Sequence, residues 1–151
     1  MKISKNFTRA EIEHSNTAKR LGIKNEMSQE HLENMQNLID NLIQPLRDSI
    51  GPIRISSGYR SPQLNKAIGG SSRSQHSKAQ ALDLQYWSDG KMNNKVIYDW
   101  ILDSNLEFDQ MINEFNFSWI HISLKKNSNR NEVLEAYKNE KGKTKYKFVE
   151  S

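Results

Sequence analysis

The stretch SSGYRSPQLNKAIGGSSRSQHSKAQALDLQ, residues 56–85, decides how this chain is interpreted. It is crowded with Ser, Gly, Arg and Asn, yet it ends in Ala81-Leu82-Asp83-Leu84, where apolar and polar residues alternate as in a half-buried strand. A polar segment of this length that leads into a core strand is either a functional site or a long surface loop. The residues around it decide between the two.

The residues before this stretch predict helices. Thr8 and Glu11 form a capping-box pattern for a short helix that runs to about Asn16, and Ser28 is the expected N-cap of a longer helix. Pro45 is expected to kink or shorten the last turn of that helix. The longer helix has one apolar stripe at helical spacing, formed by Leu32, Met35, Leu38, Ile39, Leu42 and Leu46.

The residues after Gly51 predict mostly strands. Strands are expected at 52–56, 81–84, 108–112 and 119–124, with one helix at 96–102. A terminal hairpin is expected from 133–137 and 144–149, and Gly142 supplies the unusual backbone angle in its loop. Helices first and strands later are typical of an α+β domain. No repeat and no domain boundary is visible, so we expect one domain over residues 1–151.

Composition narrows the class of protein. The 151 residues are 35% hydrophobic and 26% charged, and no apolar run is long enough to span a membrane, so a soluble protein without stable membrane insertion is expected. The first residues, MKISKNFTRAEIEHSN, have no apolar segment typical of a secretory signal. Without cysteine, a transition metal would be bound by His, Asp or Glu. Two of the four histidines, His14 and His31, lie on the helical scaffold and are expected at the surface.

The net charge of +4 comes from the end of the chain. From Lys125 onward there are eight Lys or Arg against four Glu, whereas the residues before it carry fourteen charges of each sign. Such a basic end could hold nucleic acid or an anionic cell-wall polymer. No platform of aromatic and Arg residues accompanies it, so a solvated edge is the simpler interpretation.

Three residues could together hold a metal ion. His76 lies in the polar stretch, seven positions before Asp83, and His121 lies in a strand-like segment where it faces away from Ile120 and Ile122. A carboxylate between two leucines is costly to bury unless something positive compensates it. Two imidazoles and one carboxylate fill three positions of a tetrahedral zinc and leave the fourth for water, as in catalytic sites. From spacing alone, an ordinary packed histidine remains the alternative.

Six motifs in order strengthen the metal hypothesis. They are Ser57-Gly58-Tyr59-Arg60-Ser61-Pro62, Asn65, Gly69-Gly70, Ser74-Gln75-His76, Ala81-Leu82-Asp83 and Trp119-Ile120-His121-Ile122-Ser123. Together they resemble the zinc D-Ala-D-Ala carboxypeptidase family, which also contains phage L-Ala-D-Glu endopeptidases and vancomycin-resistance dipeptidases. The resemblance covers nearly the whole chain and is closest to the compact phage-type subgroup. It implies a hedgehog-like fold, with N-terminal helices packed on a mainly antiparallel sheet that carries the zinc site.

The resemblance also implies roles for single residues. Zinc is expected on His76, Asp83 and His121. Arg60 is expected to bind the substrate's carboxylate or to polarise its scissile carbonyl, and a structural salt bridge is the alternative. Ser74 and Gln75 either line the same site or only shape the loop.

The resemblance makes Glu114 the expected general base, seven residues before His121. An exposed acid at a strand end is the alternative, and Asp109 is the reserve candidate. Other branches of the family place the acid in an acid-x-x-His arrangement, and the corresponding residue here is Ser118, which cannot act as a base.

The glycines and Ala79 concern the shape of the loop. Gly58, Gly69 and Gly70 are expected to serve tight turns. The family usually has glycine where this chain has Ala79, and alanine is unfavourable there if the turn needs a positive φ.

The expected function is hydrolysis of an amide bond in the peptide stem or cross-link of bacterial peptidoglycan by a monomeric zinc peptidase that binds no nucleic acid. A phage or prophage endolysin-type enzyme is expected, made in the cytoplasm and acting on the cell wall after release or as part of a virion. The alternatives are a non-catalytic, zinc-containing module that binds cell wall or belongs to a virion, and a nucleic-acid binder that uses the basic end. The sequence leaves carboxypeptidase and endopeptidase activity open.

Overall fold

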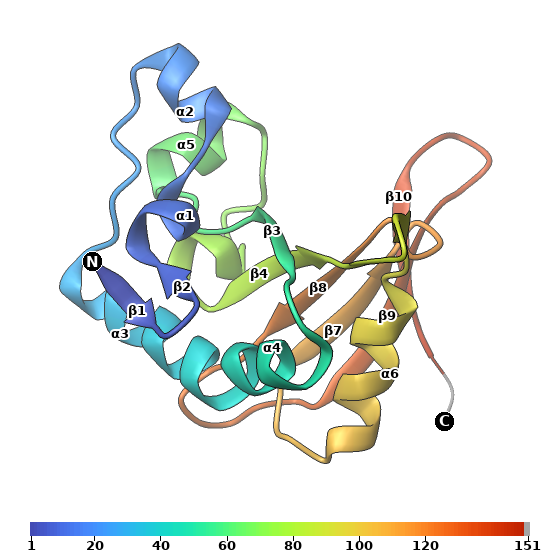
Figure 1. The fold of residues 1–151 in the computed structure, drawn as a ribbon. Coiled ribbons are helices and arrows are strands. Elements are labelled where there is room, and N and C mark those ends of the chain that lie inside the picture. Colours follow the sequence, from blue (N-terminus) through green and yellow to red (C-terminus); the bar gives the residue numbers. More distant parts are fainter. Residues whose placement is uncertain (150–151) are drawn as a thin grey trace.

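The computed structural model describes residues 1–149 (Figure 1). The helical segments are α1 (Arg9–Glu13), α2 (Asn16–Leu21), α3 (Gln29–Leu38), the π-helical η1 (Ile39–Ile43), α4 (Gln44–Ile50), α5 (Pro62–Ala67), the 3-10 turn η2 (Gln75–Lys78) and α6 (Lys95–Ser104). The strands are β1 (Lys2–Ser4), β2 (Phe7–Thr8), β3 (Arg54–Ser57), β4 (Ala81–Gln85), β5 (Trp87–Ser88), β6 (Lys91–Met92), β7 (Gln110–Glu114), β8 (Trp119–Ser123), β9 (Glu132–Lys138) and β10 (Thr144–Phe148).

The main sheet has six strands in the order β10-β9-β7-β8-β4-β3. Its neighbours are antiparallel except for β7 and β9, which run parallel. The mainly antiparallel sheet and the helices that precede it confirm the predicted α+β class. The expected terminal hairpin is also present, and its loop contains Gly142 at φ 75°.

The two faces of the sheet have different environments. One face packs on α3, η1, α4 and α6 and forms the main hydrophobic core (Figure 1), with Leu82, Leu84, Ile120, Ile122 and Met111 fully buried. Because side chains alternate along a strand, Asp83 and His121 lie on the other face. That open face also carries a small separate apolar cluster of Ile112, Leu134 and Ala136.

The first helices follow their capping residues. Thr8 and Glu11 form the predicted capping box, but α1 ends at Glu13, and Ser15 caps a separate helix, α2, that the sequence did not predict. Ser28 caps α3 as expected. The prediction for Pro45 was wrong in position: the irregular turn is the π-helical η1 before it, and Pro45 is the second residue of α4, where a missing N–H is tolerated.

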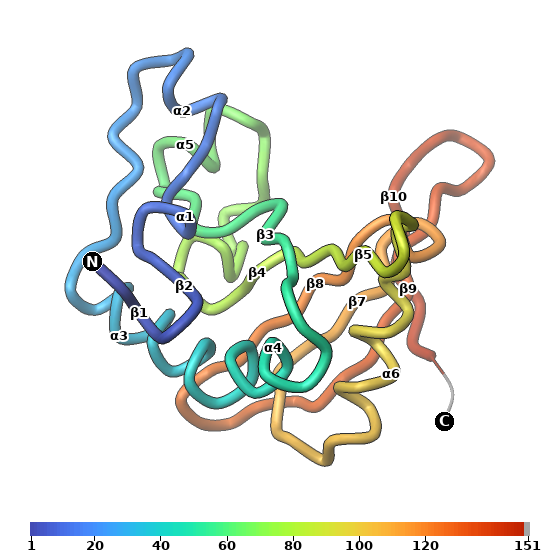
Figure 2. Tube along the Cα trace, viewed as in Figure 1, coloured from blue at the N-terminus to red at the C-terminus, as the bar shows by residue number. Residues whose placement is uncertain are grey.

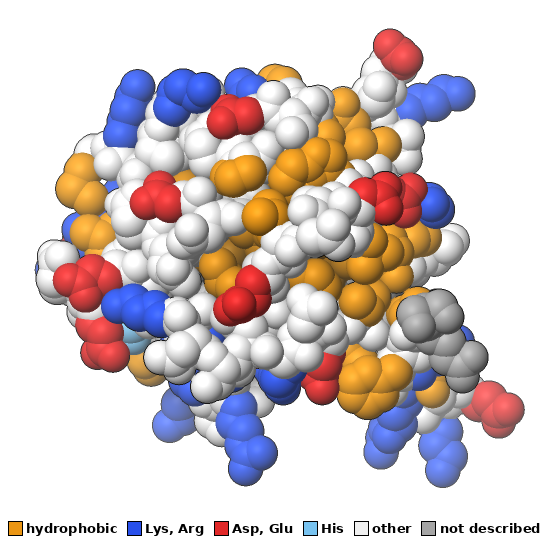
Figure 3. All heavy atoms as spheres, turned by 90° about the horizontal axis from the view of Figure 1, so that it is seen from below, with side chains coloured by type: hydrophobic (Ala, Val, Ile, Leu, Met, Phe, Trp, Pro, Cys, Tyr) orange, Lys and Arg blue, Asp and Glu red, His pale blue; other side chains and the backbone are white. Residues whose placement is uncertain are grey.

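The hairpin of β9 and β10 projects at the side of the molecule away from the N-terminus (Figure 2). From below, hydrophobic side chains gather in the half of the surface beneath α6 and the C-terminal strand, while Lys and Arg project at several places around the outline (Figure 3). Leu102 and Phe148 are among the exposed hydrophobic residues. No helix among residues 1–149 combines the length and the apolar character needed to cross a membrane.

Candidate metal centre and its cleft

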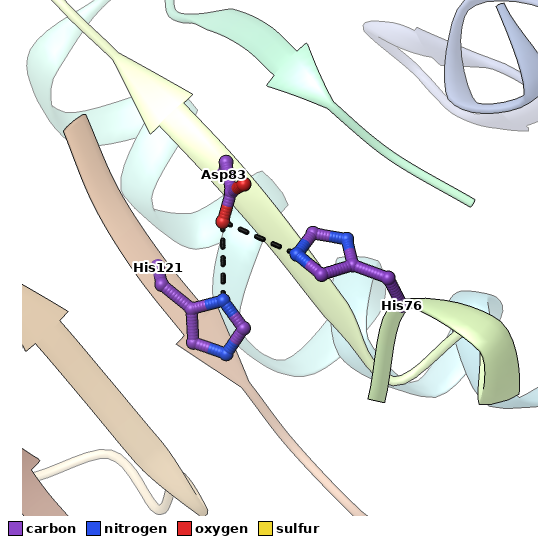
Figure 4. A group of neighbouring side chains, drawn as sticks. All are labelled: His76, Asp83 and His121. Atoms are coloured by element: carbon purple, nitrogen blue, oxygen red, sulfur yellow. Dashed lines mark hydrogen bonds and ion pairs between the residues drawn. The ribbon is translucent and has the colours of Figure 1, made fainter. Parts of the chain in front are cut away.

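The sheet and the polar stretch together assemble a compact His-Asp-His group (Figure 4). Asp83 on β4 and His121 on β8 are directly paired across the two strands, and His76 enters from η2. The Asp83 Oδ1 atom lies 3.2 Å from His76 Nε2 and 3.1 Å from His121 Nδ1. His76 is buried, and the Asp83 and His121 side chains are each 13% exposed.

The hydrogen bonds of His76 indicate that a cation belongs between these side chains. Its Nδ1 lies 2.8 Å from the carbonyl oxygen of Gly58, which can only accept, so Nδ1 carries the proton. In the neutral ring Nε2 then presents a lone pair to the carboxylate of Asp83. Two acceptors facing each other at 3.2 Å need a proton or a metal ion between them.

The donor set fits zinc. The three ligand atoms all lie within 4.8 Å of one another. Zinc binds His nitrogen and carboxylate oxygen at roughly 2.0–2.1 Å, so neighbouring ligands of a tetrahedron lie roughly 3.3 Å apart, close to the distances from Asp83 to the two histidines. Burial alone would raise the pKa of Asp83, but His76 and His121 outweigh it and hold that pKa below its usual range. The carboxylate is therefore ready to bind a cation.

Hydrogen bonds to the backbone of the polar stretch fix His76 in place. Tyr59 N donates to the carbonyl of Ile12 on α1, and Arg60 N donates to the carbonyl of His76. The buried Asn25 donates from Nδ2 to the carbonyl of Tyr59 and accepts at Oδ1 from the Ser61 backbone. These bonds satisfy the backbone of the stretch where it crosses the surface of the core.

Gly58 has a different role from the expected one. Its φ is not positive, but a Cβ there would lie 2.3 Å from the backbone oxygen of Ile12, so only glycine permits the close approach of α1. Gly69 does adopt a left-handed conformation, at φ 76°. At Gly70 a Cβ would collide with the side chain of Asn65.

Ala79 departs from the usual backbone of alanine. It is fully buried in the left-handed conformation at φ 57°, where it ends η2. This is the unfavourable case that the sequence left open, and it costs about 1–2 kcal/mol relative to glycine. The site retains its geometry despite this strain.

Glu114 lies in the same cleft as the metal group. It ends β7, is only 8% exposed, and pairs with Trp119, two residues from His121 on β8. Burial raises the pKa of Glu114 to about 7, although His121 lowers it and Asp83 raises it further. A carboxyl with this pKa can both accept and return a proton near neutral pH.

The cleft has a volume of about 690 Å3 and two unlike walls. Its polar wall contains Arg60, Arg73, Ser74 and Gln75, and its apolar wall contains Ile112, Phe115, Trp119, Leu134 and Tyr146. The His-Asp-His group and Glu114 lie in the same cleft. An apolar site with a few converging polar groups is the usual form of a small-ligand site.

Comparison with protein families agrees with this geometry. The family model described as Peptidase M15 matches residues 5–123. The chain belongs to the peptidase M15 family. It is therefore a zinc-dependent metallopeptidase of a family that hydrolyses the peptides of peptidoglycan, with the His-Asp-His group as its candidate metal site. A search among curated proteins gives no match.

The other expected site residues of this M15 peptidase also lie at the cleft. Arg60 lines it, and among the described residues Arg60 forms no ion pair and its buried Nε has no hydrogen-bond partner. Burial lowers the pKa of Arg60, although Asp83 opposes this. Ser74 lines the cleft and also caps η2 by accepting from His76 N, so it shapes the loop in any case.

The structure disfavours Asp109 as the base of the peptidase. Asp109 is fully buried and accepts hydrogen bonds from Arg130 Nε and Nη2 and from Gln75 Nε2. Burial would raise the pKa of Asp109, but Arg130 and Gln75 outweigh it and lower that pKa to about 2. A carboxylate held so firmly in its charged form is a poor proton acceptor, and its role here is to anchor Gln75.

The sequence did not identify every residue at the cleft. Arg73, Arg130, Phe115, Trp119 and Tyr146 all line it, and none had been assigned to the site. Alternation in 144–148 places Tyr146 and Phe148 on one face, but it does not tell whether that face is the one that carries the metal group.

The two remaining histidines differ in exposure. His14 is exposed, as expected, whereas His31 is half-buried and its Nδ1 lies 3.1 Å from the hydroxyl of Tyr59.

Proposed function

We propose that this peptidase hydrolyses an amide bond of the peptidoglycan stem or cross-link, with Glu114 as general base and Arg60 as the group that binds negative charge. The observation that carries the proposal is Glu114: a buried carboxyl with a pKa raised to about 7 lies in one cleft with the His-Asp-His group. Burial at a strand end has no structural benefit for a lone acid, because desolvating it is costly. A catalytic role explains its position.

The metal belongs on His76, Asp83 and His121. When bound there, zinc supplies a Lewis acid that polarises a carbonyl and lowers the pKa of water. Glu114 takes one proton from the attacking water as the new C–O bond forms. It then returns that proton to the amine nitrogen as the C–N bond breaks, so the carboxylate is regenerated.

Arg60 is suited to the negative charge of the substrate. Its guanidinium lines the cleft without an ion-pair partner among the described residues, so its donors are free for a carboxylate or a developing oxyanion. Gln75 is held by Asp109, and Ser74 lies beside it, so both present polar groups from a fixed loop. We assign Ser74 and Gln75 to substrate binding on the same wall.

We further propose an endolysin-type role, in which a phage or prophage enzyme reaches the cell wall after release. The proposal is supported by the family's substrate, which lies outside the cytoplasm, and by the excess of Lys and Arg after Leu124, which suits an anionic wall.

Two measurements test these proposals. Purified peptidoglycan is incubated with the zinc-loaded protein, and the new amino groups and fragments are identified by mass spectrometry. Glu114→Gln should abolish release, whereas the exposed Glu140→Gln should not. Zinc binding without any release in the wild type would indicate a binding module instead. Loss of turbidity after adding the enzyme to cells with accessible peptidoglycan tests the lytic role.

A further inference from the structure

The apolar wall of the cleft is built partly by residues beyond the range matched by the family. That range ends at residue 123, yet Leu134 on β9 and both Thr144 and Tyr146 on β10 line the cleft with the metal group. The hairpin of β9 and β10 therefore forms part of the substrate site. Such an element is well placed to determine which substrate the enzyme prefers.

Strand pairing places Tyr146 in line with Glu114. Glu114 pairs with Ala136, and Ala136 pairs with Tyr146, so the three side chains share one face in one row. Neighbouring strands lie about 4.8 Å apart, so Tyr146 starts about 10 Å from Glu114. The small Ala136 between them leaves room above it for a larger group. Tyr146 is 56% exposed, so its ring is available to a ligand.

Two further aromatic residues extend this wall toward the metal group. Phe115 and Trp119 lie at the turn between β7 and β8, with their ring centroids 5.6 Å apart, and both line the cleft. Partial burial and the carboxylates of Glu114 and Asp83 raise the pKa of Tyr146, so its hydroxyl stays neutral and can donate a hydrogen bond. The wall thus combines aromatic faces with a polar tip.

The stem of peptidoglycan contains small residues, acids and a diamino acid, but no large apolar side chain. Its carboxylates fit the opposite wall, where Arg60 and Arg73 lie. The component with flat apolar faces and hydroxyl groups is the sugar ring to which the stem is attached. Aromatic side chains bind such a face through contact area and dispersion.

We propose that Phe115, Trp119 and Tyr146 form a subsite for a sugar ring of the glycan strand, so that the enzyme prefers stems still attached to glycan over free stem peptides. This inference rests on the proposed function, which makes peptidoglycan the substrate. It adds that selectivity depends on the glycan part of that substrate.

The test compares a free stem peptide with the same peptide attached to its disaccharide. For the wild type, KM should be about tenfold lower for the attached substrate. Tyr146→Ala should remove this difference by raising KM for the attached substrate toward that for the free peptide, while Tyr146→Phe should retain most of the difference. The control is Tyr137→Ala, because Tyr137 lies on the opposite face of the same hairpin, paired with Lys145. It should behave as wild type.

Equal KM values for the two substrates in the wild type would overturn the subsite, as would an equal effect of Tyr146→Ala on both. Equal effects are expected if the aromatic wall instead binds the side chain of the stem's diamino acid, because both substrates contain it. If the wild type cleaves neither substrate, the proposed function fails separately, and calorimetric titration of the disaccharide alone decides the subsite. Disaccharide binding to the wild type that is lost in Tyr146→Ala supports the subsite. If the wild type does not bind the disaccharide, the subsite is overturned.

Discussion

Replacing Glu114 by Gln should make the metal-free protein more stable at high pH while abolishing its activity. The two side chains have nearly the same shape, so the difference between them is the buried charge. The pKa of Glu114 in the folded protein is about 7, against an ordinary value of 4.5. A raised pKa means that the folded state favours the protonated form. Its deprotonation therefore costs free energy of folding.

The size of this cost follows from the pKa difference. At about 1.36 kcal/mol per pKa unit, the difference corresponds to about 3 kcal/mol. Because one side of the cleft is open to solvent, screening reduces this to about 2 kcal/mol. The cost is absent below the unfolded value of 4.5, grows as pH rises and is complete above about 7. Glu114→Gln should thus match wild type near pH 4.5 and exceed it at pH 8.

Thermal unfolding of the metal-free proteins measures this directly. At pH 8 the Tm of Glu114→Gln should lie about 4–8 °C above that of wild type. With zinc restored, kcat of the variant should fall about 10²–10⁴-fold. Glu140→Gln, in the exposed hairpin loop, is the control for both measurements. A Tm difference that does not change with pH, or a kcat within a few-fold of wild type, would refute the assignment.

Three further substitutions test the residues that bind the metal or hold the site in place. Wild type should hold about one zinc per chain by elemental analysis, and His121→Ala should lose it, because three protein ligands are the minimum of a catalytic zinc site. Gly58→Ala should lower the free energy of unfolding by about 1–3 kcal/mol in denaturant titration and weaken zinc binding, because the new Cβ collides with the backbone of Ile12. Arg130→Ala should cost about 2 kcal/mol by the same titration, because it leaves the fully buried Asp109 with fewer partners.

Local patterns were sufficient to predict most elements of the fold. The alternation in 81–84 and 119–124 predicted β4 and β8, and it placed Asp83 and His121 on a face away from the leucines and isoleucines. The capping residues Thr8 and Ser28 marked true helix starts. Such signals depend on residues a few positions apart, so sequence alone contains them.

The remaining features depend on contacts between distant residues. Asn25 fixes the polar stretch through bonds to Tyr59 and Ser61, more than thirty positions away, and a single Asn in a loop gives no sign of this. The π-helical turn of η1 and the left-handed Ala79 are likewise set by packing rather than by propensity. Neither could be predicted from neighbouring residues.

The parallel pairing of β9 with β7 shows why the contribution of β9 and β10 to the cleft was missed. A chain that turns from β8 into β9 could have paired the two as neighbours, but β9 instead lies beside β7, at the side remote from β8. This placement brings β9 beside Glu114, and β10 forms the exposed outer edge of the sheet next to it. The basic end of the chain therefore contributes Leu134 and Tyr146 to the cleft. The polar stretch and the terminal hairpin, far apart in sequence, face each other across one metal group.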